Sequence, residues 1–250
     1  MIYIGKNRAL GIAIKLREQI IYDLSKSEGS ILTLSETMVV IEGYTVEGGR
    51  VRDVELVSAL RDAYDEMFYL VRDNGFQVDK ETICLVNRIV ARNENHDNIG
   101  NFRKSGIAIT GTTHKGTSVK DFGIKYIEII DRFNENKLED KAIDLFLDIA
   151  KTQFFGDGNK RTGQLMMNGI LIGEGYCPVV LNFRENKERR DKLIHFYETD
   201  DREPLKKIIL ENKDQSDIQN SKAQNTLDDH QANQTDISNP LTGEEKREEE

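Results

Sequence analysis

Two apolar runs separated by a short, glycine-rich polar turn constrain this chain more than any other feature. The runs, Ala142 to Ala150 and Leu165 to Ile172, both have the character of buried helices. The turn between them lies within Thr152 to Gly163 and carries a carboxylate, an amide and two cations. A loop that leads into a helix N-terminus presents free N–H groups and the positive end of the helix dipole. The sequence therefore predicts an anion pocket between two core helices.

Apolar residues at helical spacing predict a mainly α fold for most of the chain. Within the longest pattern, Val54, Val57 and Leu60 recur at intervals of three. Ser35 and Gly43 suit the N-cap and the C′ position of a shorter helix. Polar loops are expected at 45–51 and 93–100. The expected helices span 12–24, 34–43, 53–74, 80–90, 122–134, 140–152, 185–199 and 203–213.

Two segments depart from the helical pattern. Residues 107–119 are rich in β-branched side chains and contain Gly111 and Gly116, which predicts a short β-hairpin. Residues 176–183 are expected to form a short extended segment.

We expect three parts along the chain: an N-terminal helical extension at 1–34, a helical domain at 35–211 and a tail at 212–250. The tail has no aromatic residue and few apolar ones, so it cannot offset the entropy cost of ordering. The sequence predicts that it is disordered, and no internal repeat is evident.

The charge outside the tail is too small to imply a strongly basic or acidic partner. The formal net charge is −9, of which −6 falls in 213–250 and −3 in the rest. No basic face is evident, so nucleic acid is not an expected partner. Cys84 and Cys177 are expected to be reduced core thiols, and the four histidines lack metal-ligand spacing. No signal peptide or membrane-length apolar run is seen, which predicts a cytoplasmic protein without a membrane partner.

The central turn resembles the signature of the Fic/Doc (Fido) family, H-x-F-x-[D/E]-G-N-[G/K]-R. Gly100-Asn101-Phe102-Arg103 and the predicted hairpin resemble that family's G-x-x-R segment and target-docking flap. Val40-Ile41-Glu42-Gly43 resembles its inhibitory motif, [S/T]-x-x-x-E-[G/N]. The resemblance covers about residues 35 to 210. The positions that match the signature in register are Phe155, Asp157, Gly158, Asn159, Lys160 and Arg161.

The resemblance implies a Fic/Doc-like helical bundle with a small β-hairpin flap at 107–119, where a protein target would dock. It also implies transfer of part of a nucleotide, most often AMP from ATP with Mg²⁺, to a protein hydroxyl. By position, Asp157 would hold the metal, and carboxylate oxygens suit Mg²⁺. Arg161 would pair with phosphate, as guanidinium groups do. Gly158 and Asn159 would cradle phosphate, and the nucleotide-binding set is completed by Lys160, Thr162 and Gly163.

The largest departure from the family pattern is Gln153, which stands at the position of the catalytic histidine. A glutamine amide does not titrate near neutral pH, so it can orient a nucleophile but cannot accept its proton. Loss of a general base costs about 10²–10⁴-fold in rate. His114 in the predicted flap is a substitute base or, on the simpler interpretation, a histidine at an exposed hairpin tip.

Three further departures concern the phosphate end and the inhibitory motif. Lys160 stands where most AMP-transferring members have glycine, and lysine is the variant of Doc-like proteins, which transfer phosphate. Gln164 stands where many members have a second arginine, the usual partner of the inhibitory glutamate. Met38 stands where the motif has Ser or Thr, with Thr37 one residue out of register. Self-inhibition through Glu42 is therefore a hypothesis in which the glutamate has no obvious ion-pair partner except Arg161 or Lys160.

The sequence leaves several functions open. The first is Mg-ATP-dependent AMP transfer to a protein hydroxyl, weakened or altered by Gln153. A Doc-like protein phosphotransferase and a catalytically dead nucleotide-binding regulator are the alternatives. A tight helix–helix connection without a ligand remains the simplest structural interpretation of the turn.

Overall fold

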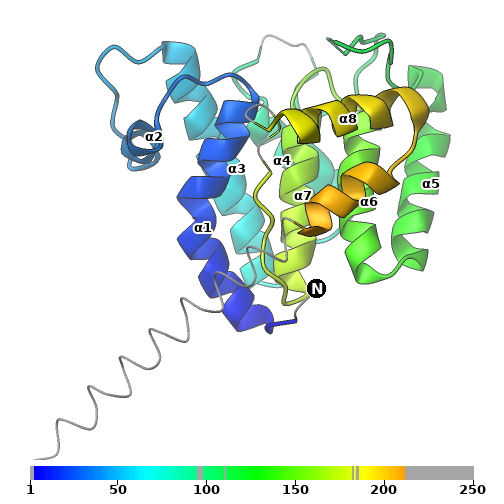
Figure 1. Cartoon of the computed structure of the whole chain (residues 1–250), viewed down its shortest axis with the longest axis horizontal. Coiled ribbons are helices and arrows are strands. Elements are labelled where there is room, and N and C mark those ends of the chain that lie inside the picture. The colour runs from blue at the N-terminus through cyan, green and yellow to red at the C-terminus, as the bar shows by residue number, and fades with distance from the viewer. Residues whose placement is uncertain (1–2, 95–97, 110, 182, 184–185, 212–250) are drawn as a thin grey trace, which may run out of the picture.

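The computed structural model describes residues 3–94, 98–109, 111–181, 183 and 186–211, and within them the regular elements are helical. Figure 1 shows long helices lying side by side, with α8 crossing one end of the bundle. The expected mainly α fold is confirmed. The elements are α1 (Lys6–Ser27), α2 (Leu34–Ile41), α3 (Val51–Arg72), α4 (Lys80–Val90), η1 (Val119–Asp121), α5 (Phe122–Glu135), α6 (Leu138–Thr152), α7 (Asn159–Gly173), α8 (Lys187–Thr199) and a last helical stretch at 203–211.

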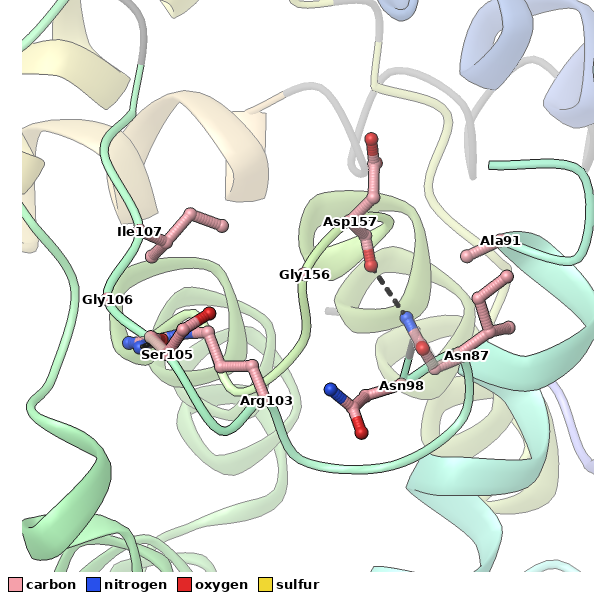
Figure 2. Close-up of a pocket in the computed structure, with 10 residues that line it drawn as sticks. Asn87, Ala91, Asn98, Arg103, Ser105, Gly106, Ile107, Gly156 and Asp157 are labelled. Atoms are coloured by element: carbon pink, nitrogen blue, oxygen red, sulfur yellow. Dashed lines mark hydrogen bonds between the residues drawn. The ribbon is translucent and has the colours of Figure 1, made fainter. Parts of the chain in front are cut away.

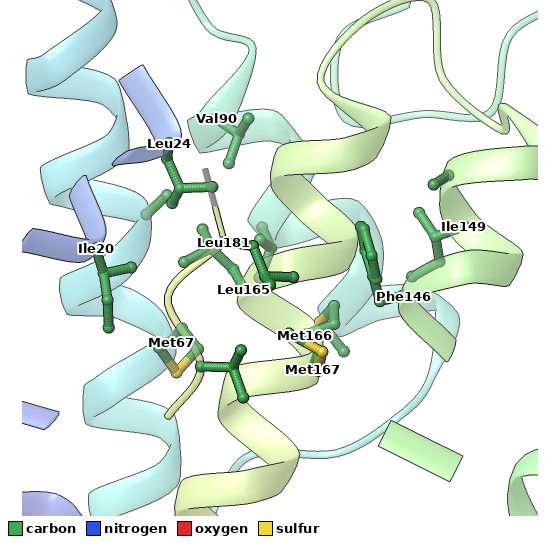
Figure 3. Close-up of a cluster of buried hydrophobic side chains, with 14 of the residues drawn as sticks. Ile20, Leu24, Met67, Val90, Phe146, Ile149, Leu165, Met166, Met167 and Leu181 are labelled. Atoms are coloured by element: carbon green, nitrogen blue, oxygen red, sulfur yellow. The ribbon is translucent and has the colours of Figure 1, made fainter. Parts of the chain in front are cut away.

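Helix α7 is the centre of the bundle, because it packs against α1, α3, α4 and α6. Its closest neighbour is α6: a Cβ built on Gly163 would lie 3.0 Å from the carbonyl oxygen of Phe146. Figure 3 shows side chains of these helices meeting in one cluster. Side chains of α1, including Ile20 and Leu24, belong to this core, so the first helix is packed into the same body as the rest.

Helix α2 starts from a different cap than the sequence analysis expected. Ser35 lies inside the helix, and the N-cap is Thr33. The Thr33 hydroxyl accepts from the Glu36 N–H at 3.2 Å, while the Glu36 carboxylate accepts from the Thr33 N–H at 2.7 Å. This reciprocal capping box outcompetes a lone serine cap. The expectation for Gly43 is confirmed, since it follows the C-cap with φ +94°.

The predicted β-hairpin at 107–119 is wrong for the residues that the structure describes there, since none of them is in a strand. Its backbone groups bond elsewhere: the Thr117 N–H donates to the carbonyl of Thr152 at 3.0 Å, and the Thr117 carbonyl accepts from Arg103 at 2.5 Å. The segment is therefore a loop fastened to the end of α6. We call residues 107–109 and 111–118 the flap loop.

The segment 176–181 that follows α7 is also held without strand pairing. The side-chain amide of Asn168 donates to the carbonyl of Val179 at 3.0 Å and accepts its N–H at 2.8 Å. The side-chain amide of Asn168 thus satisfies the backbone groups of Val179 that a neighbouring strand would otherwise bond. Cys84 and Cys177 are both buried thiols, as the sequence analysis expected.

Buried ion pairs fix the C-terminal helical stretch to α6. Arg202 pairs with Asp148 at 2.6 Å and with Asp144 at 3.3 Å, and both aspartates are almost fully buried. Arg132 of α5 also reaches Asp148, at 2.7 Å. The predicted disordered tail, 212–250, lies outside the described residues. Within the described part of the chain, no helix is long and apolar enough to cross a membrane.

Candidate functional site

The glycine-rich turn connects α6 to α7 through two left-handed residues. Gln153 ends α6 with φ 54°, and Gly158 caps α7 with φ 78°. A Cβ on Gly158 would meet Asn87 Nδ2 and Val90 Cγ1, each at 3.1 Å. Glycine is therefore required both for the backbone conformation and for the close approach of α4.

The Asn159 side chain holds the turn closed. Its Oδ1 accepts from the Phe155 N–H at 3.0 Å, and its Nδ2 donates to the Phe155 carbonyl at 2.9 Å. The same Nδ2 donates to Gln153 Oε1 at 3.0 Å, and Gln153 Nε2 donates to the Ala150 carbonyl at 2.5 Å. Both ends of the Gln153 amide are thus engaged within the protein.

Arg161 lies almost fully buried among three carboxylates. Its Nη2 is 2.5 Å from Asp157 Oδ1 and 3.2 Å from Glu94 Oε1, and its Nε is 3.7 Å from Glu28 Oε1. Burial by itself would lower the pKa of Arg161, but the charges of Glu28, Asp157 and Glu94 outweigh it and raise that pKa. The guanidinium is therefore a permanent cation, and its Nε has no hydrogen-bond partner.

The acid that reaches the cations of the turn is Glu28, which the sequence analysis did not select. One carboxylate oxygen of Glu28 lies 3.6 Å from Lys160 Nζ and 3.7 Å from Arg161 Nε. Glu42 is exposed and forms no ion pair with Lys160 or Arg161, all three of which the structure describes. The carboxylate of Glu28 thus occupies the position of an anion between the two cations.

Glu28 and Glu42 share a local sequence signal, which explains why the sequence alone did not separate them. Each acid ends a helix and precedes a glycine with positive φ, +91° at Gly29 and +94° at Gly43. Only the packing of α1 against α7 decides that Glu28 is the one near the turn.

A cavity of about 420 Å³ opens at this end of the bundle. This volume is in the range of small-molecule sites, roughly 300–1,000 Å³. Its walls come from the turn, the flap loop, the end of α1 and one face of α8. The lining residues are Glu28, Ile107, Ala108, Ile109, Thr112, Gln153, Gly156, Asp157, Gly158, Asn159, Lys160, Arg190, Leu193, Ile194 and Tyr197.

Asp157 is placed by its backbone, and its side chain stays accessible. Figure 2 shows its main-chain oxygen facing Asn87, whose Nδ2 donates to it at 2.9 Å, while the carboxyl group is directed away. The Asp157 side chain is 39% exposed. Asn87 also donates to Thr162 Oγ1 at 3.2 Å and accepts the Gly100 N–H at 3.1 Å. Asn87 is thus a positioning residue that the sequence analysis missed, because a lone asparagine within a helical pattern gives no signal.

A second, smaller cavity of about 50 Å³ lies beside Asp157 and is shown in Figure 2. Arg103 lines it and is buried without a carboxylate partner among the contacts described. Its Nε donates to the Gln153 carbonyl at 2.7 Å, and its two other nitrogens donate to the carbonyls of Ser105 and Thr117. Burial lowers the pKa of Arg103. Arg103 therefore ties the flap loop to the turn.

Two of the expected site residues, Thr162 and Gly163, face the protein interior: Thr162 is fully buried, and Gly163 packs on Phe146. Gln164, which stands where many family members have a second arginine, is also buried, at 4% exposed. None of them lines the large cavity. They support the packing of α7, and the cavity surface is provided by Gly158, Asn159 and Lys160 instead.

His114 is half-buried and does not sit at an exposed tip. Its ring stacks on Tyr197 with an interplanar angle of 2°, and its Nε2 lies 2.8 Å from the Lys151 carbonyl. A carbonyl only accepts, so this nitrogen carries the proton. His114 is absent from the residues that line the large cavity.

No group of three or more His, Cys, Asp or Glu side chains in the described ranges is arranged to hold a metal ion. Mg²⁺, however, commonly uses one or two carboxylates together with substrate phosphates. Asp157 at the cavity wall is suited to such shared binding.

This fold and site define a helical domain whose central helix begins at a ligand-sized cavity. Residues 77–171 match the model of the Fic/DOC family. The match includes α4, the flap loop, the turn and most of α7, so this region of the chain is similar to the Fic/DOC family. Comparison with curated proteins gave no match.

Solved structures with the same fold extend beyond the region of the family match. Fic-1 from C. elegans superposes with a TM-score of 0.73 at 18% identity, covering 88% of this chain and 73% of that one. A Fic family protein from Desulfovibrio desulfuricans gives 0.70 at 17% identity, covering 85% and 66%. A variant of IbpAFic2 in complex with adenylylated Cdc42 gives 0.51 at 16% identity, covering 80% and 70%. At these identities the likeness shows the fold.

Proposed function

We propose that this chain is a nucleotide-binding Fic-type protein that transfers AMP from Mg-ATP to a protein hydroxyl, with catalysis weakened by Gln153. The observation that carries the proposal is the cavity at the α7 N-terminus, where the Glu28 carboxylate lies between Lys160 and Arg161. A phosphate group has the charge and hydrogen-bonding capacity to replace that carboxylate. The buried Nε of Arg161 has no hydrogen-bond partner and lies 3.7 Å from this carboxylate, so it would be next to the anion that replaces it.

The residues of the turn fit a magnesium nucleotide. Asp157 would hold the metal together with phosphate oxygens, and Gly158, Asn159 and Lys160 would contact the phosphates. Bound Mg-ATP would supply the adenylyl group. The complex of the IbpAFic2 variant with adenylylated Cdc42 supports this group transfer as a chemistry of the fold. We also propose that a protein target of this chain approaches the flap loop, and that the chain is located in the cytoplasm.

The position of Glu28 also replaces Glu42 in the proposed self-inhibition. A carboxylate that fills the anion position must leave before a phosphate can bind there, because two anions cannot share the same cations without repulsion. The carboxylate of Glu28 therefore lowers the affinity for nucleotide, because it must be displaced before the phosphate binds.

A catalytically silent nucleotide-binding regulator is the second candidate, and the geometry of Gln153 favours it. Gln153 cannot take a proton, and its amide is already engaged by Ala150 and Asn159. The predicted Doc-like phosphotransfer rests on Lys160, which lines the cavity.

Mass spectrometry separates these functions. The full chain is incubated with ATP, Mg²⁺ and a cell lysate, and modified proteins are detected by their mass. A gain of AMP that disappears in Asp157→Ala supports the first function, and a gain of phosphate supports the Doc-like activity. Nucleotide binding without any mass change supports the regulator, whereas neither binding nor modification rejects all three.

A further inference from the structure

A further cavity, of about 310 Å³, lies at the end of α7 that is opposite the glycine-rich turn. We call it the far cavity. Its walls come from the start of α1, the end of α3 and the loop after it, the end of α5, the start of α6 and the end of α7. Figure 1 shows the start of α1 at this end of the bundle, away from α8. The volume is at the lower limit of small-molecule sites, roughly 300–1,000 Å³, and no residue that lines the far cavity also lines the cavity at the turn.

Part of the wall of the far cavity is apolar. Phe76 and Phe133 line it, and both are partly buried and pack against the hydrophobic core. Gly169 lets the Phe76 ring lie directly on α7, because a Cβ at this position would be 2.3 Å from Phe76 Cζ. At Gly173 there is free space instead, since a Cβ there would meet only Val71 Cγ1, at 3.7 Å. The last turn of α7 therefore contributes open volume to the cavity.

Two half-buried cations line the same cavity. Lys6 Nζ donates to Asn74 Oδ1 at 2.5 Å, and Lys141 Nζ lies 5.0 Å from the centroid of the Phe133 ring. Neither lysine forms an ion pair with a carboxylate of the residues that the structure describes. A charge that is partly removed from water is stabilised by a counterion. The far cavity is therefore suited to an anionic ligand.

Other groups at the far cavity limit the charge of that ligand. Helices α3 and α7 end here with the negative ends of their dipoles, whereas α1 begins here with its positive end. Glu174 also lines the cavity and is exposed. The local charge is thus only weakly positive, which favours a singly charged carboxylate over a doubly charged phosphate.

We propose that the far cavity binds a small carboxylic acid with an apolar, aromatic body. The carboxylate meets Lys6 and Lys141, and the body packs on Phe76 and Phe133. The proposal does not depend on the nucleotide-binding function, because the two cavities have no lining residue in common.

Isothermal titration calorimetry with two ligands of the same shape tests the class of ligand. 2-Naphthoate combines an aromatic body with one carboxylate, and 2-naphthamide has the same body without the charge. The full chain is expected to bind 2-naphthoate roughly 5-fold more tightly, as about 1 kcal/mol of ion pairing predicts.

Lysine variants test the cations. Lys6→Gln and Lys141→Gln are each expected to weaken binding of 2-naphthoate roughly 2- to 5-fold and to leave binding of 2-naphthamide unchanged. Lys207→Gln is the control at an exposed lysine outside the cavity and should bind both ligands as the wild type does.

Gly173→Leu tests the location, because its side chain would fill the open volume at the end of α7. Binding of both ligands is expected to be lost, with a melting temperature no lower than that of the wild type. Gly11→Leu is the control: Gly11 is an exposed residue of α1, and a Cβ there meets nothing within 4 Å. This variant should bind both ligands normally.

Each remaining result overturns the proposal. Absence of 2-naphthoate binding by the wild type rejects the site, and unchanged binding by Gly173→Leu places the ligand elsewhere. Equal affinities for the two ligands reject the anionic class. If Gly173→Leu melts at a clearly lower temperature, the lysine variants decide, and unchanged 2-naphthoate binding by both of them rejects the proposal.

Discussion

At the scale of single residues, the turn combines positions that the sequence identifies with contacts that it does not. Gly158, Asn159 and Lys160, which the sequence analysis selected, line the cavity. The engagement of the Gln153 amide by Ala150 and Asn159 follows only from the left-handed backbone at Gln153. Gln153, which the family resemblance places at the base position, therefore also takes part in the hydrogen bonds that hold the turn.

Gln153→His tests whether the missing base is the main catalytic defect. Histidine titrates near neutral pH, so AMP transfer is expected to rise by about 10²-fold or more. The measurement is transfer of α-labelled ATP to protein in a lysate. Gln153→Ala is the control. It also removes the hydrogen bonds of the Gln153 amide but adds no base, so AMP transfer should not rise. Equal activity of the two variants would contradict the prediction.

Glu28→Gln tests the carboxylate between Lys160 and Arg161. Removing its charge frees the anion position, and Mg-ATP affinity is expected to rise roughly 5-fold, corresponding to about 1 kcal/mol of ion pairing. Calorimetric titration measures the change. Glu42→Gln is the matched control at the other helix end and should bind as the wild type does. A rise in Glu42→Gln alone would restore Glu42 to the inhibitory role.

At the scale of elements, the position of the site depends on how closely α6 and α7 pack. Sequence periodicity located both helices, and the observed ranges Leu138–Thr152 and Asn159–Gly173 agree with the two apolar runs. The flap loop was predicted wrongly because β-branched residues favour strands only when partners for a ladder exist. Here Arg103 and the end of α6 take those backbone groups.

Gly163→Ala is expected to separate α6 from α7. The added Cβ would lie 3.0 Å from both the Phe146 ring and its carbonyl oxygen. Relieving the contact with the carbonyl oxygen requires a shift of the α6 backbone. Overpacking of this kind costs about 1–3 kcal/mol, measured by denaturant unfolding. Gly173→Ala is the control on the same helix, because its Cβ would meet only Val71 Cγ1 at 3.7 Å. If both variants are equally stable, the contact is not tight.

At the scale of the whole molecule, ion pairs join the C-terminal helical stretch to the bundle. Arg202, Arg132 and Lys206 converge on the carboxylates of Asp144 and Asp148. In the sequence, neither the charges of these residues nor their spacing shows that they form buried ion pairs and do not belong to a solvated surface. The α8 wall of the cavity lies directly before this stretch in the chain.

Arg202→Gln is expected to loosen this attachment. Asp148 would keep Arg132 but lose a charged hydrogen bond at 2.6 Å, which predicts a loss of about 1–3 kcal/mol in the free energy of unfolding. Chemical denaturation measures it. Arg72→Gln removes an exposed pair with Asp73 and should cause no measurable change. Similar effects of both substitutions would show that the C-terminal stretch does not depend on these contacts.

The sequence by itself determined the helical class, most helix positions and the Fic/DOC-like turn, because periodicity and fixed motif spacing are local properties of the chain. Tertiary structure alone decided that Glu28 rather than Glu42 meets the cations, that the flap loop has no strand among its described residues, and that Tyr197 faces the cavity. Each of these depends on contacts between residues far apart in sequence, whose partners are set only when α1, α7 and α8 pack together.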